Sequence, residues 1–157
     1  MDFASQTGRT LHDEHRASLA LLGRAEGALT GGATGPDAAS TAKDLAHHLR
    51  QEVDRHFGFE EASLFPRLAE AGEADIAELL AEEHDSIRAV ADELLPMLQA
   101  VADGRPGDAR ALARGVVELI ERQVAHIQKE SMALLPLLDD LLDDETDRAL
   151  AFEYASR

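Results

Sequence analysis

The amino-acid sequence predicts an all-α fold, an antiparallel up-down four-helix bundle with a short extra C-terminal helix. Leu and Ala dominate its apolar residues, and aromatic residues make up only 4% of the chain, which favours helix over sheet. Long stretches with helical periodicity are separated by short breakers, and no alternating run has turn residues at hairpin spacing. Long helices joined by short loops pack most simply as an antiparallel bundle.

The first two helices are bounded by Gly and Pro. The first is expected over about residues 10–30, where the turn sequence GGATGP follows. The second begins near Pro36 and continues until Pro66 disturbs it, and Gly72 closes the segment that follows. These breakers predict one helical hairpin in the first half of the chain.

The second half repeats this arrangement. A third helix is expected over about residues 73–102, and Pro96 should kink or shorten it. After the breaker DGRPGD, Asp108 is the expected N-cap of a fourth helix, which reaches Leu135 before Pro136. A short helix over about residues 144–155 begins with the acidic run DDETD, which suits the positive end of a helix dipole.

Length and charge restrict the class of protein. A chain of 157 residues is most simply one domain, residues 1–157. The 15 basic and 31 acidic residues give a net charge of −16, which argues against nucleic acid and anionic membranes as partners. The absence of cysteine excludes disulfides, thiolate metal sites and Cys nucleophiles.

The same sequence suggests a cytoplasmic location. The N-terminal residues MDFASQTGRTLHDEH do not form a basic region followed by an apolar run, so no signal peptide is expected. No apolar stretch approaches the roughly 20 residues that a membrane-spanning helix needs. The sequence does not determine the oligomeric state.

An internal repeat carries the chemistry. HFGFEEASLFP, which starts at His56, aligns with HIQKESMALLP, which starts at His126, so that His, Glu and Pro recur at matching positions. DEHRASLALL likewise resembles EEHDSIRAVA, which places His15 opposite His84. Each half therefore supplies one His from its first helix and His-x-x-x-Glu from its second. The repeated residues are His15, His56, Glu60, His84, His126 and Glu130.

These six polar residues lie on apolar helix stripes. The stripes are Leu11, His15, Leu19 and Leu22; Leu45, Leu49, Val53, His56, Glu60 and Leu64; Ile76, Leu80, His84, Ile87 and Ala91; and Val116, Ile120, Gln123, His126, Glu130 and Leu134. A buried carboxylate is costly to ionise unless it is paired or coordinates a metal. Of the other histidines, His47 and His48 are rotated off the stripe, and His12 stays ambiguous.

The donor types indicate a pair of metal ions. His and Glu four residues apart on one helix can point at a common centre, as in other bundle metal sites. Imidazole suits iron, zinc and copper, and carboxylates suit iron and manganese and can bridge two ions. One ion cannot readily take six residues from two symmetry-related halves. We therefore pair His15 with His56 on one ion and His84 with His126 on the other, bridged by Glu60 and Glu130.

The doubled motif resembles the hemerythrin-like (HHE cation-binding) domain family over about residues 10–138. The resemblance implies a four-helix bundle that holds two non-haem iron ions, bridged by an oxo or hydroxo group, and that meets dioxygen, peroxide or nitric oxide. Oxygen-carrying hemerythrins have a fifth histidine one turn along the third helix. Here Leu80 and Arg88 stand at the positions four before and four after His84, which leaves the second iron more open. His12 is an alternative extra ligand.

Three functions remain open at this stage. The first is reversible binding of a small diatomic ligand, dioxygen, for storage or sensing. The second is an enzyme that acts on peroxide in a catalase-like reaction or on nitric oxide, so the sequence does not decide whether the protein is an enzyme. The third is an iron-responsive interaction protein. Manganese or zinc could occupy the same ligands.

Several neighbours of the ligand positions are interpreted as structural. Glu61, Glu83, Asp13 and Glu82 are read as solvated helix residues, and Tyr154 as unconnected with the metals. The acidic run over residues 139–147 is read as a solvated loop and helix start. Phe57, Phe59 and Phe65 are expected to pack in the core or line the pocket. Phe65 and Leu135 occupy equivalent positions of the repeat, and both are expected to shield the site.

Overall fold

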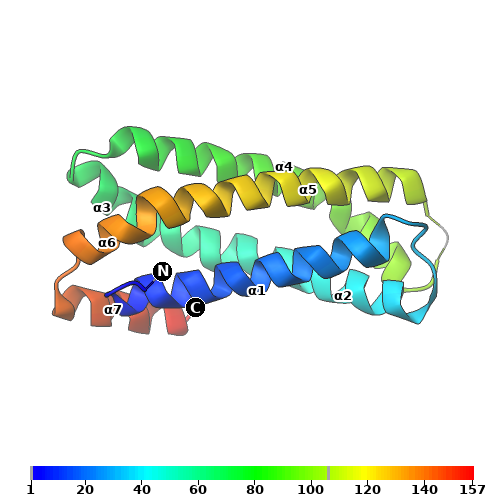
Figure 1. The fold of residues 1–157 in the computed structure, drawn as a ribbon, viewed down its shortest axis with the longest axis horizontal. Coiled ribbons are helices and arrows are strands. Elements are labelled where there is room, and N and C mark those ends of the chain that lie inside the picture. Colours follow the sequence, from blue (N-terminus) through cyan, green and yellow to red (C-terminus); the bar gives the residue numbers. More distant parts are fainter. Residues whose placement is uncertain (1, 106) are drawn as a thin grey trace.

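The computed structural model describes residues 2–105 and 107–157, and every regular element in these ranges is helical. Four long helices lie side by side along the molecule (Figure 1). They are α1 (Gln6–Leu29), α2 (Gly35–Gln51), α4 (Ala74–Ala102) and α5 (Ala109–Lys129). Helix α1 packs against α2 and α5, and α4 packs against the same two, so the long helices form a ring of contacts around one core.

The second arm of each hairpin continues past its proline. Helix α2 runs on through two π-helical segments, η1 (Glu52–Phe57) and η2 (Glu60–Leu64), into α3 (Phe65–Glu70). Helix α5 does the same through η3 (Glu130–Leu134) into α6 (Leu135–Leu141). Pro66 and Pro136 stand in the first turn of α3 and α6, where the missing N–H is tolerated. The widened π turns directly before them let the chain stay helical, and such turns are frequent at functional sites.

The helix ends follow the predicted capping chemistry. The Asp108 side chain accepts hydrogen bonds from the backbone N–H groups of Arg110 and Ala111, which confirms it as the N-cap of α5. Helix α7 spans Asp144–Ala155, as predicted. Pro96 does not shorten its helix, since α4 continues through it to Ala102. Of the breaker DGRPGD, residue 106 lies outside the described residues.

A polar layer divides the core into two apolar clusters. The first contains Leu22, Leu49, Ile87 and Leu119, and the second contains Leu11, Leu64, Leu80 and Leu134. In each of the four long helical arms, counting the π-helical continuations of α2 and α5, one of the four repeated histidines lies between a member of each cluster. Helices α1 and α4 run from the second cluster to the first, and α2 and α5 with their continuations run from the first to the second. The six repeated residues therefore meet at one level of the molecule.

The predicted stripes need two corrections. Leu19 is 38% exposed, and Ser18 takes the buried position on α1. Val53 is half-buried and packs against the first cluster, but Glu52 next to it is buried as well, at the start of the π-helical segment η1, where the register of the turn changes. Both corrections add a polar side chain to the core next to His48 and His56.

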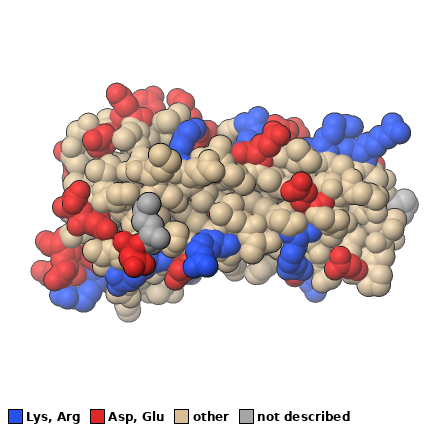
Figure 2. Space-filling view, viewed as in Figure 1, with Lys and Arg blue, Asp and Glu red and all other residues tan. Residues whose placement is uncertain are grey.

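The acidic C-terminal run holds the N-terminus of α1. Asp139 accepts hydrogen bonds from the backbone N–H groups of Ala4 and Ser5, and Asp147 accepts from those of Gln6 and Thr7. Carboxylates are favourable at the positive end of a helix. The reading of these aspartates as merely solvated was therefore wrong. Acidic side chains gather at this end of the molecule, at the left in Figure 2. None of the helices in the described ranges is long and apolar enough to cross a membrane.

Candidate metal centre

The six repeated residues converge in the polar layer. His84 and His126 come together with Glu60 and Glu130, and their donor atoms all lie within 4.8 Å of one another. His15 and His56 form a second group with Glu130, within the same distance. Glu130 belongs to both groups. This is an arrangement in which two cations could share one carboxylate.

The donor atoms in this layer are buried and lack hydrogen-bond partners among the described residues. Unpartnered are the Nε2 atoms of His56, His84 and His126 and both side-chain oxygens of Glu60 and Glu130. Both glutamates are 0% exposed. Orphaned buried polar atoms are rare because each one costs free energy. Their mutual orientation fits a set of metal ligands, so the residues present suit the two ions that the motif implies.

The distances between these donors are those of groups that face a common point. His84 Nε2 lies 3.5 Å from Glu60 Oε1 and 3.7 Å from Glu130 Oε1. His15 Nε2 lies 3.6 Å from Glu130 Oε2, and His56 Nε2 lies 3.1 Å from Glu60 Oε1. His126 Nε2 also contacts Glu130 Oε1. Each imidazole thus directs Nε2 into the layer.

Three of the four histidines place their other ring nitrogen against a glutamate. Nδ1 of His56 lies 3.0 Å from Glu14 Oε2, Nδ1 of His84 lies 2.8 Å from Glu61 Oε1, and Nδ1 of His126 lies 2.9 Å from Glu83 Oε1. Such a carboxylate fixes the tautomer and the ring orientation and makes Nε2 a better donor. The interpretation of Glu61 and Glu83 as ordinary solvated residues was therefore wrong. Asp13 and Glu82 are exposed, as expected.

A sequence signal for two of these carboxylates was present. Glu14 directly precedes His15, and Glu83 directly precedes His84, so the two glutamates occupy matching positions of the repeat. Each reaches across to the histidine of the following helix instead of its own neighbour, because adjacent residues on a helix point in different directions. That cross-helix contact could not be seen in the spacing alone.

Tyr154 is connected to the centre, contrary to the sequence interpretation. Its hydroxyl donates to Glu14 Oε2, the oxygen that also contacts His56. Arg55 Nη1 donates to the other oxygen of Glu14 at 2.9 Å, and the Arg55 guanidinium lies 4.2 Å from the centre of the Tyr154 ring. The helix α7 that carries Tyr154 thus helps to hold Glu14 in place.

Burial and opposite charges set the ionisation of the centre without metal. Burial alone would lower the pKa of His84, but the close carboxylates of Glu130 and Glu60 outweigh it and raise that pKa to about 9. Burial would raise the pKa of Glu130, but the close imidazoles of His126 and His84 hold it well below its usual value. Burial and the Glu130 charge raise the pKa of Glu60. Protons therefore occupy the layer when no cation does, and a cation must displace them.

His15 behaves differently from the other three. Its Nδ1 is buried and has no partner among the described residues. Burial lowers the pKa of His15 to about 4, and the opposing attraction to Glu130 offsets only part of this effect. His15 is therefore a neutral imidazole at neutral pH.

Aromatic and aliphatic side chains wall the centre. The ring of Phe57 stacks on His84, with centroids 3.8 Å apart and planes 6° apart, and the ring of Phe65 lies 5.3 Å from His84. Phe65 and Leu135 are both buried in the second apolar cluster, as expected for equivalents in the repeat. Phe59 is also buried and packs against Tyr154. These groups keep bulk water from the donor atoms.

The remaining histidines stay outside both donor groups. His12 is half-buried and packs edge-on against Phe3, with ring centroids 5.3 Å apart. His47 is exposed, as predicted. His48 lies 3.9 Å from Glu52 and lines a small cavity of about 180 Å³ beside His56. Ser18, Glu14 and Tyr154 line it as well.

The pKa of Glu14 predicts a pH-dependent contribution to stability. Burial alone would raise this pKa, but hydrogen bonds from His56 and Tyr154 and the charges of His56 and Arg55 lower it from 4.5 to about 2. Because the folded-state value is depressed, the contribution is fully present above about pH 4.5 and is lost as pH falls towards 2. Urea unfolding of the metal-free protein should show wild type more stable than Glu14→Gln at pH 6, with the difference shrinking below pH 4.5. A constant difference would contradict the prediction.

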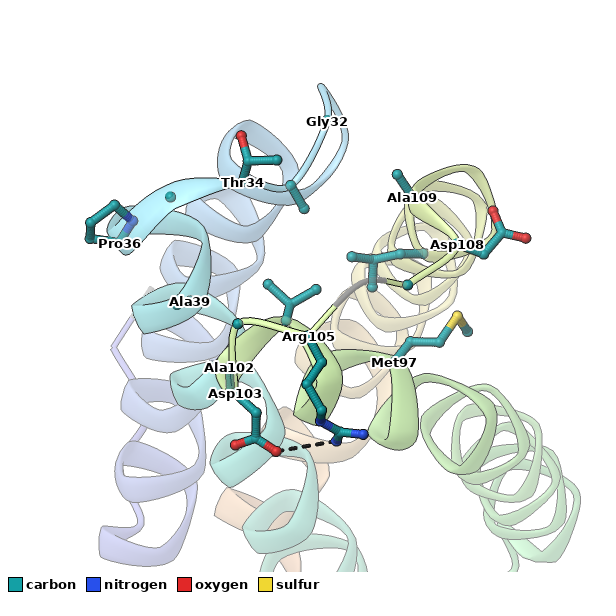
Figure 3. Close-up of a pocket in the computed structure, with 16 residues that line it drawn as sticks. Gly32, Thr34, Pro36, Ala39, Met97, Ala102, Asp103, Arg105, Asp108 and Ala109 are labelled. Atoms are coloured by element: carbon teal, nitrogen blue, oxygen red, sulfur yellow. Dashed lines mark hydrogen bonds and ion pairs between the residues drawn. The ribbon is translucent and has the colours of Figure 1, made fainter.

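A larger hollow lies away from the centre. It has a volume of about 840 Å³ and lies between the α1–α2 and α4–α5 connections. Figure 3 shows Met97, Ala102 and Pro36 around it, and Arg105 lies 3.2 Å from Asp103 in an ion pair. Its lining holds none of the repeated histidines or glutamates. This hollow is therefore separate from the candidate metal centre.

Comparison with family models places the chain in a known family. A family model described as the hemerythrin HHE cation-binding domain matches residues 7–138. The matched span contains all six repeated residues and the three glutamates that bind their imidazoles. No curated protein matches the chain significantly.

Proposed function

The chain belongs to the hemerythrin HHE cation-binding domain family, as its repeated motif indicated, and on this premise we propose that it is a non-haem di-iron protein that binds dioxygen reversibly for storage or sensing. The ligands in this proposal are His15, His56, Glu60, His84, His126 and Glu130. These residues would hold the iron pair, which would supply the redox chemistry that reversible dioxygen binding needs. Reversible uptake needs a site that is dry and has a free coordination position.

The convergence of the buried, unpartnered nitrogen and oxygen atoms carries this proposal. The six residues would give each ion two imidazoles and part of the two carboxylates, so an iron held there would have a free coordination position. The position of a fifth histidine is filled by Leu80, which is buried in the second apolar cluster, or by Arg88, whose guanidinium binds Glu61. Neither side chain competes for a free coordination position.

The residues around the metal ligands would favour a small bound molecule that gains negative charge. Ser18 and Gln123 are buried, and their side-chain oxygens and nitrogen have no partner among the residues that the structure describes. Ser18 lies one turn from His15 on α1, and Gln123 lies one turn from His126 on α5. A hydroxyl and an amide can donate hydrogen bonds to a ligand that gains negative charge.

The surrounding fold supports the same proposal. We take residues 1–157 as one domain, an antiparallel up-down four-helix bundle with α7 as its extra helix. Along the chain, α1 passes from the second apolar cluster to the first, and α2 with its continuation passes from the first to the second. This opposite order supports an antiparallel arrangement of neighbouring helices. A cytoplasmic location, where ferrous iron is available, remains part of the proposal.

A spectroscopic experiment tests dioxygen binding. The iron-loaded protein is reduced without air, exposed to air, and returned to vacuum. Reversible binding predicts a charge-transfer spectrum that appears in air and disappears under vacuum over several cycles. One-way oxidation to a ferric form would exclude a storage role. Iron content per chain, measured on the same sample, is expected to be two.

A second candidate function is an enzyme that disproportionates peroxide or reduces nitric oxide at the same centre. The observation in its favour is that Arg88 is bound to Glu61, so the iron next to His84 has more room for a substrate than a fifth histidine would leave. The iron-loaded protein should then release dioxygen from peroxide, and His84→Ala should abolish this release. Equal rates for the two proteins would exclude the enzyme. An iron-responsive interaction protein is a third candidate, without a specific contact in its favour.

A further inference from the structure

The contacts behind His84 are absent behind His15. Nδ1 of His84 lies 2.8 Å from Glu61 Oε1. Arg88 holds the same glutamate with two hydrogen bonds, 2.7 Å from Nη1 to Oε1 and 3.1 Å from Nη2 to Oε2. Such paired bonds fix a carboxylate in one orientation. Imidazole, carboxylate and guanidinium thus form a connected chain that orients His84.

In the other half of the repeat, the residues that match Glu61 and Arg88 are both different. Ser131 stands at the position that matches Glu61, and Leu19 stands at the position that matches Arg88. A serine side chain is too short to reach as a glutamate does, and Leu19 cannot orient an anion. Nδ1 of His15 accordingly has no hydrogen-bond partner in residues 2–105 and 107–157. The two halves, alike in their ligands, differ in what holds those ligands.

The two buried glutamates between the histidines do not make this difference. Glu130 lies with both pairs of histidines, and Glu60 Oε1 lies 3.5 Å from His84 Nε2 and 3.1 Å from His56 Nε2. The asymmetry therefore lies behind the imidazoles, where Nδ1 of His84 has a carboxylate partner and Nδ1 of His15 has none among the described residues. It weakens the attraction of a cation to the pair that contains His15.

We infer that the two metal subsites are unequal: the His84–His126 subsite holds its ion tightly, the His15–His56 subsite releases its ion first, and Glu61 with Arg88 are positioning residues that set the difference. This inference rests on the proposed two-metal function. Loss of an outer carboxylate on a ligating histidine typically weakens metal binding roughly 10–100-fold. The protein should therefore pass through a one-ion form as free metal falls, and its two-ion form should respond to metal supply.

Competition with a chromophoric chelator measures the two dissociation constants for ferrous iron without air. Wild type should give two constants at least about 10-fold apart. Ser131→Glu should tighten the weaker one, and the double variant S131E with L19R, which restores both outer members, should tighten it further. Glu61→Ser is the mirror variant and should weaken the tighter constant by about 10–100-fold. Ser131→Ala is the matched control and should change neither.

The outcomes separate this inference from the proposal on which it rests. If wild type binds no iron, the two-metal function fails, and the inference fails with it. If wild type binds two ions with equal constants, the inequality is refuted. If folded S131E and E61S have the same constants as wild type, the positioning role of Glu61 and Arg88 is refuted. The two-metal function stands in both cases. Circular dichroism of each variant establishes that it is folded. A gain of affinity in S131E cannot arise from general loss of structure.

Discussion

Glu130→Ala is expected to abolish tight binding of both metal ions. Glu130 is 0% exposed and is the one residue that belongs to both donor groups among the described residues. Its removal takes a ligand from each ion and leaves His84 and His126 without the carboxylate that lies next to their Nε2 atoms. The loss should exceed the roughly 10–100-fold that removal of an outer partner costs. Metal content per chain after dialysis should fall from two ions to none.

Two other glutamates on the same helices provide the controls for this experiment. Glu60→Ala removes a carboxylate that lies 3.5 Å from His84 Nε2 and 3.1 Å from His56 Nε2 but leaves Glu130 in both donor groups, so it should weaken metal binding less than Glu130→Ala. Glu121→Ala removes an exposed glutamate from α5 and should leave both ions bound. If Glu130→Ala retains two ions while its helix content is unchanged, Glu130 is not a shared ligand. The ligand assignment would then have to be abandoned.

Removal of the metal is expected to lower the melting temperature by roughly 10 °C. A ligand that binds only the folded state at about 1,000 times its Kd contributes about 4 kcal/mol of stability. For a chain of this size, each kcal/mol shifts Tm by about 2–4 °C. Without metal, donor atoms of Glu60, Glu130 and three of the repeated histidines also stay buried without partners among the described residues. Calorimetry of the metal-loaded and chelator-treated protein at pH 7 measures the difference.

The Glu130→Ala variant distinguishes a specific effect of metal from a general one. Its melting temperature should be the same with and without chelator, because it has no ions to lose. Wild type should regain its original Tm when iron is added back. An unchanged melt of wild type on chelation would show that no metal stabilises the bundle, and it would count equally against the iron-responsive interaction protein.

Much of the fold could be predicted from the sequence because it depends on local chemistry. Asp108 caps α5 through its own side chain, and α7 begins after the acidic run. The inward position of His56 and His126 followed from helical periodicity. Periodicity did not predict the burial of Glu52, because the π turn of η1 changes the number of residues per turn, which no local composition reveals.

The environment of the centre could be predicted less well. Glu61 and Tyr154 look like surface residues when each is judged from its own helix. Their partners, His84 and Glu14, come from other helices, 23 and 140 residues away in the chain. Side-chain contacts across helices depend on the rotation and axial offset of each helix. Those two quantities follow from packing of the whole bundle.

The sequence alone determined that two like helical hairpins each present a histidine and a His-x-x-x-Glu pair on their apolar faces, since that follows from spacing and from the internal repeat. Only the tertiary structure decided which carboxylate stands behind which imidazole, and that His15 alone of the four has none among the described residues. The physical reason is that periodicity fixes the direction of a side chain from its own helix axis. The identity of the group it meets depends on how neighbouring helices are rotated and shifted against one another.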